Sequence, residues 1–167
     1  MTSRGRWDRS RGPGTPGMTT RPRGYASSGA RTPAEPGDVR LLLDTTVLID
    51  ALRGRPVVQR VLALRQSGEV PLICAINVEE LWRGVRTAEE PSLVRLLGGL
   101  RVVPLGAAEG RMAGRWRRDF AAEGRTLHQA DCLIAAAAVT AGATLATGNP
   151  SDFPMPELRV EHWPVNG

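Results

Sequence analysis

The chain has 167 residues, of which 41% are hydrophobic and 23% charged. This length and balance indicate one globular domain, and they exclude a chain that is disordered throughout and a collagen-like repeat. The longest strictly apolar run covers residues 132–139, which is too short to cross a membrane, so we expect no membrane association. The arginine-rich N-terminus has no apolar signal-peptide core, and we therefore expect a cytoplasmic protein. Cys74 and Cys132 lack the spacing of a disulfide framework or a zinc site, so we expect both to be small buried apolar residues.

Positive charge is concentrated at the N-terminus. Residues 1–38 contain seven arginines and three acidic residues, a net charge of +4, whereas the remaining 129 residues have a net charge of +1. Residues 1–38 also contain no Leu, Ile, Val or Phe, so they cannot bury enough apolar surface to offset the entropy lost on folding. We expect a disordered Arg/Gly/Pro-rich tail at 1–38, suited to capture a polyanion, followed by a single domain at 39–167.

The segments after residue 38 alternate between strands and helices. Near-continuous apolar runs such as 39–44 and 70–76 are typical of strands that are buried on both faces of a parallel sheet. Strands that alternate with helical stretches predict right-handed crossovers. We therefore expect an α/β fold with three layers, α/β/α, around a mostly parallel central sheet of four or five strands. In chain order, the expected elements are a strand at 39–44, helices at 45–54 and 56–68, a strand at 70–76, helices at 77–85 and 89–100, a strand at 101–105, helices at 107–124 and 127–142, a strand at 143–147 and an edge strand at 158–163.

Acidic side chains follow the ends of the expected strands. In such open sheets the ligand crevice lies beyond the carboxyl ends of the strands, so residues from distant stretches of the chain meet there. Carboxylates that share a cleft raise each other's pKa, and a hard divalent cation such as Mg²⁺ or Mn²⁺ relieves this repulsion. Such a cation can orient a phosphodiester and lower the pKa of bound water, which favours phosphodiester hydrolysis without an organic cofactor. The candidate residues are Asp44 after the first strand, Asn77 and Glu80 after the second, Asp131 in the first turns of the alanine-rich helix, and Asn149 and Asp152 after the strand at 143–147.

Each acid also has a local interpretation. Asp44 could cap the helix that follows it, and Asn77 and Glu80 have the spacing of a helix capping box. Asp131 could interact with the dipole of its helix, and Asp152 could stabilise a turn. A local role accounts for each acid alone, but it does not explain why all four fall at one edge of the sheet.

Three segments together resemble the PIN-domain nucleases, most closely the VapC toxins of toxin–antitoxin pairs. LLLDTTVLIDALRG (41–54) is similar to the opening strand and helix of that family, and NVEELWRG (77–84) is similar to its second acidic motif. ADCLIAAAAVTAGATLATGNPSDF (130–153) is similar to its closing motif, which is the most specific of the three because it fixes many positions. The resemblance covers about residues 39–163 and leaves the tail without a counterpart.

The resemblance implies a divalent-metal-dependent endoribonuclease with Mg²⁺ or Mn²⁺ as its cofactor. Asp44, Glu80 and Asp131 match the three acids that hold the metal. Members of the family use either the position of Asn149 or that of Asp152 as the fourth, and we expect Asp152 to act through water on a second ion while Asn149 orients it. The implied partners are an RNA, often a tRNA or a ribosomal loop, a VapB-type antitoxin, and a second copy of the chain in a homodimer.

Other polar residues lie within or beside these motifs. Thr147 and Asn77 fall inside the matching segments, and we expect them to support the site. Arg53 and Arg83 lie just after acidic motifs, where they could contact phosphate or pair with acids. His128 precedes Asp131 by three residues and shares its helical face, which favours a capping or supporting role.

One helix carries a stripe of arginines. Arg111, Arg115 and Arg118 have the spacing of a single helix face. They could track an RNA backbone, but a solvated face is the favoured interpretation because charge stripes usually lie on the surface. Trp82 and Trp116 are expected in the core or at a dimer interface.

A non-catalytic interaction module is the alternative to a nuclease, and in it the acids would serve only the fold and partner binding. A receiver-like phosphoacceptor normally needs a lysine near its site, and this chain contains none. A haloacid-dehalogenase-type phosphatase needs Asp-x-Asp, but Asp44 is followed by Thr45 and Thr46.

Overall fold

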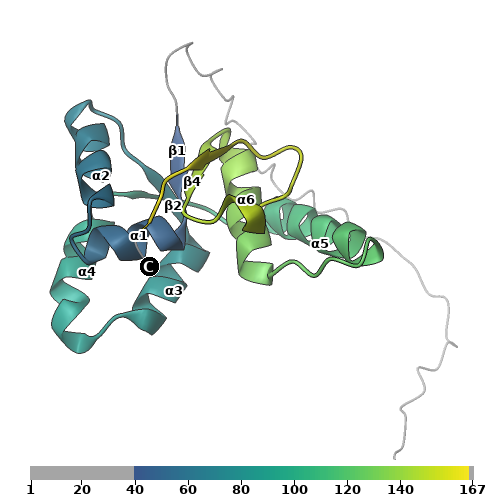
Figure 1. Ribbon diagram of the computed structural model, residues 1–167, viewed down its shortest axis with the longest axis horizontal. Coiled ribbons are helices and arrows are strands. Elements are labelled where there is room, and N and C mark those ends of the chain that lie inside the picture. Colours follow the sequence, from purple (N-terminus) through teal and green to yellow (C-terminus); the bar gives the residue numbers. More distant parts are fainter. Residues whose placement is uncertain (1–39, 166–167) are drawn as a thin grey trace, which may run out of the picture. The chain divides into compact units, whose positions relative to one another are not determined.

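The structure, a computed structural model, describes residues 40–165, which form a five-stranded sheet flanked by helices (Figure 1). Residues 1–39 and 166–167, and with them the expected tail at 1–38, lie outside the described residues. The strands are β1 (Leu41–Leu43), β2 (Leu72–Cys74), β3 (Arg101–Val103), β4 (Thr144–Thr147) and β5 (Val160–His162). The helices are α1 (Thr45–Leu52), α2 (Val57–Gln66), α3 (Ala75–Gly84), α4 (Glu90–Leu97), α5 (Ala107–Ala122) and α6 (Gln129–Ala141), with short 3-10 helices η1 (Thr87–Glu89) and η2 (Pro150–Asp152).

The strands form one sheet in the order β3-β2-β1-β4-β5, and every neighbouring pair is parallel. The chain proceeds outward from β1 to β2 and β3, and it then returns through α5 and α6 to the other side of β1, where β4 and β5 lie. The order of the strands therefore reverses between β1 and β4, which is where ligands bind in open α/β sheets. The expected parallel sheet is confirmed, with the last strand at an edge.

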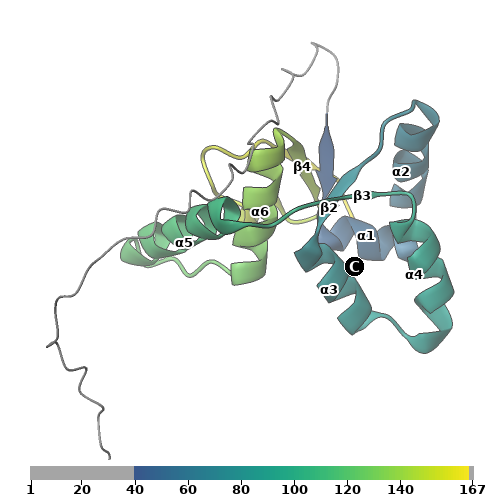
Figure 2. The ribbon, with the colours of Figure 1, turned by 180° about the vertical axis from the view of Figure 1, so that it is seen from behind.

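Alternate residues of β1 pack into two hydrophobic clusters on opposite faces of the sheet, as the period of a strand requires. Leu41 and Leu43 contact the cluster that includes side chains of α1 to α4, whereas Leu42 contacts the cluster formed with α5 and α6. Figures 1 and 2 show α1, α2 and α4 on one side of the strands and α5 and α6 on the other. The three layers are therefore the two helical faces and the sheet between them, which confirms the expected α/β/α fold.

Helix α6 packs closely because its central side chains are small. Ala135, Ala136, Ala137 and Ala138 are all fully buried between the sheet and α5. The helix ends at Gly142, whose φ of 65° is left-handed and strains any other residue type. This close packing fixes the position of α6, and the first turn of the helix lies at the carboxyl edge of the sheet.

The elements occur in the expected order, but several boundaries differ. The strands are shorter than expected, since only three or four residues of each pair with a neighbour. Helix α3 begins at Ala75, two residues before the expected start, and η1 and η2 were not expected. Cys74 and Cys132 are buried and free, as expected. No helix within residues 40–165 is both long enough and apolar enough to cross a membrane.

Candidate active site

Asp44 lies directly after β1, and its side chain is held at the carboxyl edge of the sheet with only 5% of its surface exposed. Oδ1 accepts a hydrogen bond from the main-chain amide of Thr45 at 2.7 Å. Oδ2 accepts from the hydroxyls of Thr46 at 2.6 Å and Thr147 at 2.8 Å. Asp44 is therefore the N-cap of α1, as the local interpretation expected. The two threonine hydroxyls also fix its carboxylate in one orientation, because a buried acceptor is stable only when it is satisfied.

The loop after β4 is tied to the start of α1. Besides donating to Asp44, Thr147 accepts a hydrogen bond from the amide of Asn149 at 3.0 Å. Thr46 accepts from the amide of Gly148 at 3.1 Å. A Cβ at residue 148 would collide with the side chain of Val165, so glycine permits this close approach. These contacts join segments that are more than 100 residues apart at the point where the strand order reverses.

Thr45 connects the first acid to the second acidic segment. Its hydroxyl donates to Oε2 of Glu80 at 2.6 Å and accepts from the side-chain amide of Asn77 at 3.0 Å. Glu80 is half-buried on α3, whereas Asn77 is fully buried. This three-residue relay fixes the direction of the Glu80 carboxylate toward the end of β1.

The capping-box interpretation of Asn77 and Glu80 is wrong. Because α3 begins at Ala75, Asn77 is the third residue of the helix, and its Oδ1 accepts from the amide of Cys74 at 2.8 Å. The Asn77 side chain thus caps the start of α3 from the third helical position, and Glu80, a turn further along, faces Thr45.

Asp131 lies in the first turn of α6, next to the other acids. Burial, followed by the charges of Asp44, Asp152 and Glu80, raises its pKa from 3.8 to about 6, while His128 acts in the opposite direction. Burial is the largest cause of this shift, and the smaller charge effects mean that Asp131 lies within electrostatic range of the other three carboxylates. His128 is the exposed N-cap residue of α6, but its side chain makes no capping hydrogen bond.

Asp152 closes the short helix η2 and is exposed. Its amide donates to the carbonyl of Asn149 at 3.1 Å, so the residue does take part in a turn. Asn149 is also exposed, immediately after the buried Thr147 and the half-buried Gly148. Both side chains therefore face solvent at the open side of the site.

The carboxylates are neighbours rather than a closed coordination shell. Within residues 40–165, no three His, Cys, Asp or Glu side chains lie close enough together, as they stand, to hold a metal ion. Asp44 and Glu80 instead direct oxygens to threonine hydroxyls. Nevertheless, all four groups offer hard oxygen donors, and their mutual repulsion at Asp131 is the kind that a divalent cation relieves. The donor set fits Mg²⁺ or Mn²⁺ by its chemistry.

The candidate arginines are all at the surface. Arg83 pairs with Glu79 at 3.1 Å on the exposed side of α3, and Arg53 is exposed at the end of α1. Arg111, Arg115 and Arg118 are likewise exposed. Both tryptophans were expected in the core or at a dimer interface. Trp116 is buried in the core, whereas Trp82 is 43% exposed and is not a core residue.

Sequence reasoning missed the roles of Thr45 and Thr46. Both were noted only because they break an Asp-x-Asp pattern, yet they hold Glu80 and Asp44 respectively. Their position in the sequence could have predicted these roles, since a hydroxyl one or two residues after a strand-end acid can reach either that acid or a neighbouring element.

Comparison with known proteins places this geometry in a family. The PIN domain family matches residues 41–154, more than half of the chain. Ribonuclease VapC19 of Mycobacterium tuberculosis is 34% identical over 120 residues, which cover 71% of this chain and 96% of that protein. Ribonuclease VapC10 of the same species is 35% identical over 127 residues, covering 76% of this chain and 96% of the relative.

Solved structures share the fold. The chain matches VapBC from Salmonella typhimurium, solved bound to DNA, with a TM-score of 0.63 and 25% identity over 75% of this chain and 98% of that one. It matches VapBC2 from Rickettsia felis, solved bound to a DNA fragment from its promoter, with a TM-score of 0.67 and 24% identity over 75% of this chain and 99% of that one. With its parallel sheet, the acids at the carboxyl edge and these relatives, the chain belongs to the PIN-domain family.

Proposed function

We propose that this chain is a Mg²⁺- or Mn²⁺-dependent endoribonuclease and the toxin of a VapBC-type toxin–antitoxin pair. The proposal is supported by the position of Asp44 at the end of β1, by the contact of Glu80 with the neighbouring Thr45, and by the effect of the Asp44, Asp152 and Glu80 charges on Asp131. The similarity to VapC ribonucleases over almost their full length supports RNA as the substrate.

Each acid has a stated role in this proposal. Asp44, Glu80 and Asp131 would hold the first ion, and Asp152 would act through water on a second ion, oriented by Asn149. When bound, the metal supplies a more acidic water and a positive charge opposite the phosphate. The chain's own hydroxyls and amide, at Thr45, Thr46, Thr147 and Asn77, would keep the carboxylates in place.

Two exposed arginines would contact the substrate. Arg53 lies beyond α1 and Arg83 lies on α3, each within a few residues of an acidic motif. A guanidinium offers a planar fork of donors that matches a phosphate. We propose that they hold RNA phosphates beside the acids, and that Arg83 exchanges its partner Glu79 for phosphate.

The partners proposed for the chain are a VapB-type antitoxin and a second copy of itself. Structures of VapBC complexes share this fold over nearly their full length. Trp82, which is 43% exposed, is a large apolar side chain that a homodimer would cover. We also propose that residues 39–167 are the nuclease domain, that 1–38 are a tail, and that the protein acts in the cytoplasm.

Cleavage of structured RNA by the purified full-length chain tests the proposal. We expect cleavage with Mg²⁺ or Mn²⁺, loss of cleavage with EDTA, and no cleavage by Asp44→Asn or Asp131→Asn protein. Glu123→Gln is the control, because it removes an exposed acid at the end of α5, an element that carries none of the four acids. Cleavage that survives Asp44→Asn or Asp131→Asn would refute the site.

Calorimetric titration with Mn²⁺ separates the nuclease from a non-catalytic interaction module. Binding that is lost in Asp131→Asn protein supports the metal site. If Mn²⁺ does not bind at millimolar concentration, the acids serve only the fold and partner binding, and the nuclease proposal fails.

A further inference from the structure

Arginines gather at the edge of the sheet opposite the acids, where the strands begin. Arg40 immediately precedes β1, Arg101 opens β3 and Arg159 immediately precedes β5. All three are exposed. Three of the five strands therefore begin at, or directly after, an exposed arginine.

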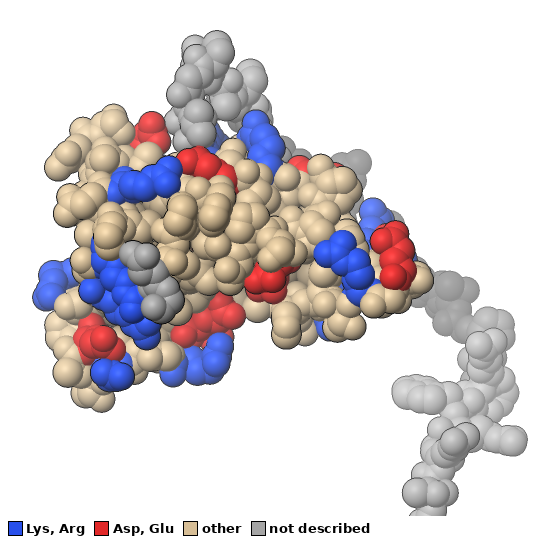
Figure 3. Space-filling model, viewed as in Figure 1, with Lys and Arg blue, Asp and Glu red and all other residues tan. Residues whose placement is uncertain are grey.

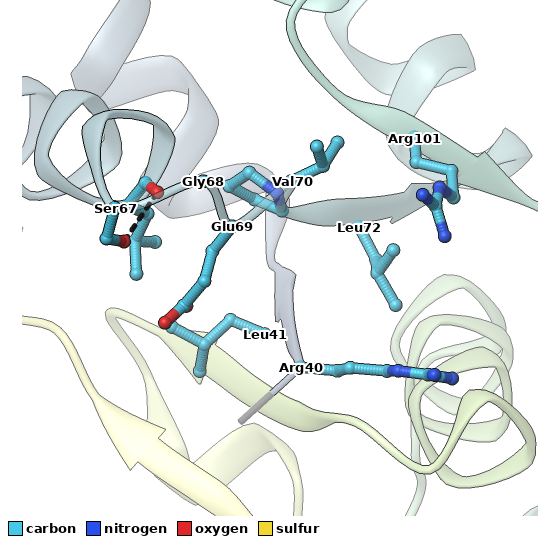
Figure 4. A pocket seen from close by; sticks show the side chains of 10 residues that line it. Arg40, Leu41, Ser67, Gly68, Glu69, Val70, Leu72 and Arg101 are labelled. Atoms are coloured by element: carbon cyan, nitrogen blue, oxygen red, sulfur yellow. Dashed lines mark hydrogen bonds between the residues drawn. The ribbon is translucent and has the colours of Figure 1, made fainter. Parts of the chain in front are cut away.

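Arg40 and Arg101 point to the same face of the sheet. Leu42 pairs with Leu72, and Leu72 pairs with Arg101. Arg40 lies two residues before Leu42, so the alternation of a strand places its side chain on the same face as Leu42, Leu72 and Arg101. Figure 4 shows Leu72 between the two arginine side chains, with both guanidinium groups on the same side of it. Because β1 and β3 are two strand spacings apart, the two backbones are separated by about 10 Å.

Both arginines contribute to the lining of a cavity of about 450 Å³. Arg40 and Arg101 line it together with Ser67, Val70 and Leu72. Glu69 is the one acidic residue among the described side chains that line it, and Figure 4 shows Glu69 directed away from the two guanidinium groups. Positive charge thus exceeds negative charge in the lining.

Two further arginines extend the positive surface. The guanidinium of Arg65, at the end of α2, lies against Gly99, where an added Cβ would be only 2.5 Å from its Cζ. The missing side chain of Gly99 therefore lets Arg65 reach the turn that leads to Arg101. Arg159 donates to the carbonyl of Gly142 at 3.0 Å, which fixes it beside the start of β4. We call Arg40, Arg65, Arg101 and Arg159 the arginine edge.

We propose that the arginine edge binds the phosphate backbone of an RNA strand, as a second contact apart from the carboxylates. Guanidinium groups match phosphate geometry, and several of them spread along one edge favour a polyanion over one small anion. The seven arginines of residues 1–38 join the described chain at Arg40, which adds positive charge in sequence next to this edge. Figure 3 shows blue side chains at the top of the molecule, where red ones lie beside them, and side chains of both colours over the rest of this face.

The two edges lie at opposite ends of the sheet, whose faces are both covered by helices. An RNA strand that contacts both edges must therefore pass over a helical layer. We therefore expect the arginine edge to contribute to the affinity for RNA and not to the chemical step.

Fluorescence anisotropy of a labelled single-stranded RNA tests the inference in the full-length chain. The protein carries Asp131→Asn and the buffer contains EDTA, so that RNA is bound but not cleaved. Adding Arg40→Gln and Arg101→Gln should reduce the slope of log Kd against log salt by about 1.4, since each lost phosphate contact with a single strand contributes about 0.7. Arg86→Gln with Arg118→Gln is the matched control, because both residues are exposed on other elements and the loss of charge is the same.

The outcomes are distinct. A change confined to the Arg40/Arg101 pair, with recovery by Arg40→Lys and Arg101→Lys, supports the inference. An equal change in the control pair, no change in either pair, or no RNA binding at all overturns it. Circular dichroism melting of each variant identifies any that fails to fold, and Arg101→Gln alone then replaces the double variant, with an expected change of about 0.7. Because binding is measured without metal, a protein that binds RNA in this way but never cleaves it would overturn only the nuclease proposal.

Discussion

The hydroxyl of Thr45 donates a hydrogen bond to Oε2 of Glu80 at 2.6 Å, joining side chains 35 residues apart. The hydroxyl oxygen of Thr45 also accepts a hydrogen bond from the side-chain amide of Asn77, so the hydroxyl proton is left to bond Glu80. Glu80 is thereby held toward the end of β1, where Asp44 lies. A residue adjacent to one acid thus sets the position of another acid.

Replacing Thr45 by valine should lower the rate of RNA cleavage about tenfold, because supporting contacts to metal-binding carboxylates typically contribute this much. Valine keeps the volume but removes the hydroxyl, so Glu80 loses its donor and Asn77 loses its acceptor. Steady-state cleavage at saturating Mn²⁺ measures the effect.

Thr45→Ser is the control for that substitution, since serine keeps the hydroxyl. It should retain most of the activity, and the Mn²⁺ affinity should fall in Thr45→Val protein but not in Thr45→Ser protein. If both variants cleave RNA like the parent, the relay has no role in positioning Glu80.

Thr147→Val should destabilise the folded chain by about 1–3 kcal/mol, the cost of a buried polar group left without its partner. The substitution removes the donor to Asp44 and the acceptor for the Asn149 amide, and both residues of the Thr147–Asp44 contact are buried. Urea unfolding monitored by circular dichroism gives the difference in the free energy of unfolding. Thr144→Val on the same strand is the control, and an equal loss there would contradict the prediction.

The order of the elements could be read from the sequence because each strand is a nearly pure apolar run. Leu41 to Leu43 are buried on both faces, a pattern that is typical of a covered parallel strand. The alanine run of α6 likewise predicted a buried helix. These features depend on local composition, and tertiary packing did not change them.

The start of α3 could not be read in the same way. Asn77 is a strong helix-start residue, and its sequence position suggested the N-cap. In the fold its side chain reaches back from the third helical position to Cys74, a choice that depends on the turn after β2. Likewise, the spacing of Arg83 suggested either phosphate or an acid as its partner, and the structure pairs it with Glu79 on its own helix.

The convergence of the acids could be predicted from topology, but the contacts among them could not. Strand ends meet at one edge of any parallel sheet, so the positions of Asp44 and Asp131 followed from the element order. The hydroxyl contacts of Thr45, Thr46 and Thr147 depend on side-chain rotamers and on segments up to 103 residues apart. Sequence spacing contains no information about those rotamers.

Asp152→Asn and Asn149→Ala should differ in their effects. If Asp152 acts on a second ion, Asp152→Asn should lower cleavage about tenfold or more while the affinity for the first Mn²⁺ is unchanged. Asn149→Ala should have a smaller effect on cleavage, because in this proposal the Asn149 side-chain amide only orients Asp152. Calorimetry that counts bound Mn²⁺, together with cleavage rates, distinguishes the two, and the reverse order of effects would assign the fourth position to Asn149.

Asp131→Asn should stabilise the metal-free chain at pH 8. The fold raises the pKa of Asp131 from 3.8 to about 6, so the folded chain binds this proton more tightly than the unfolded chain does. The ionised carboxylate therefore destabilises the fold above pH 6, and this cost diminishes as the pH falls from 6 to about 4. Asparagine removes the cost, which we place at about 1 kcal/mol because Asp131 is only partly buried and solvent screens its charge. Urea unfolding in EDTA should show the gain at pH 8 and not at pH 4, and a gain of equal size at both would contradict the assignment.

The same carboxyl should couple metal binding to proton release. At pH 6 about half of the Asp131 side chains carry a proton, which a bound cation must displace, whereas at pH 8 almost none do. Calorimetric titration with Mn²⁺ in two buffers of different ionisation enthalpy should therefore report release of about half a proton at pH 6 and close to none at pH 8. Below pH 6 the apparent affinity should fall about tenfold for each pH unit, because the protonated acid cannot bind a cation. Glu79→Gln protein should behave like the parent, since Glu79 faces solvent beside Arg83. Proton release that is unchanged between pH 6 and pH 8 would show that the metal binds without Asp131.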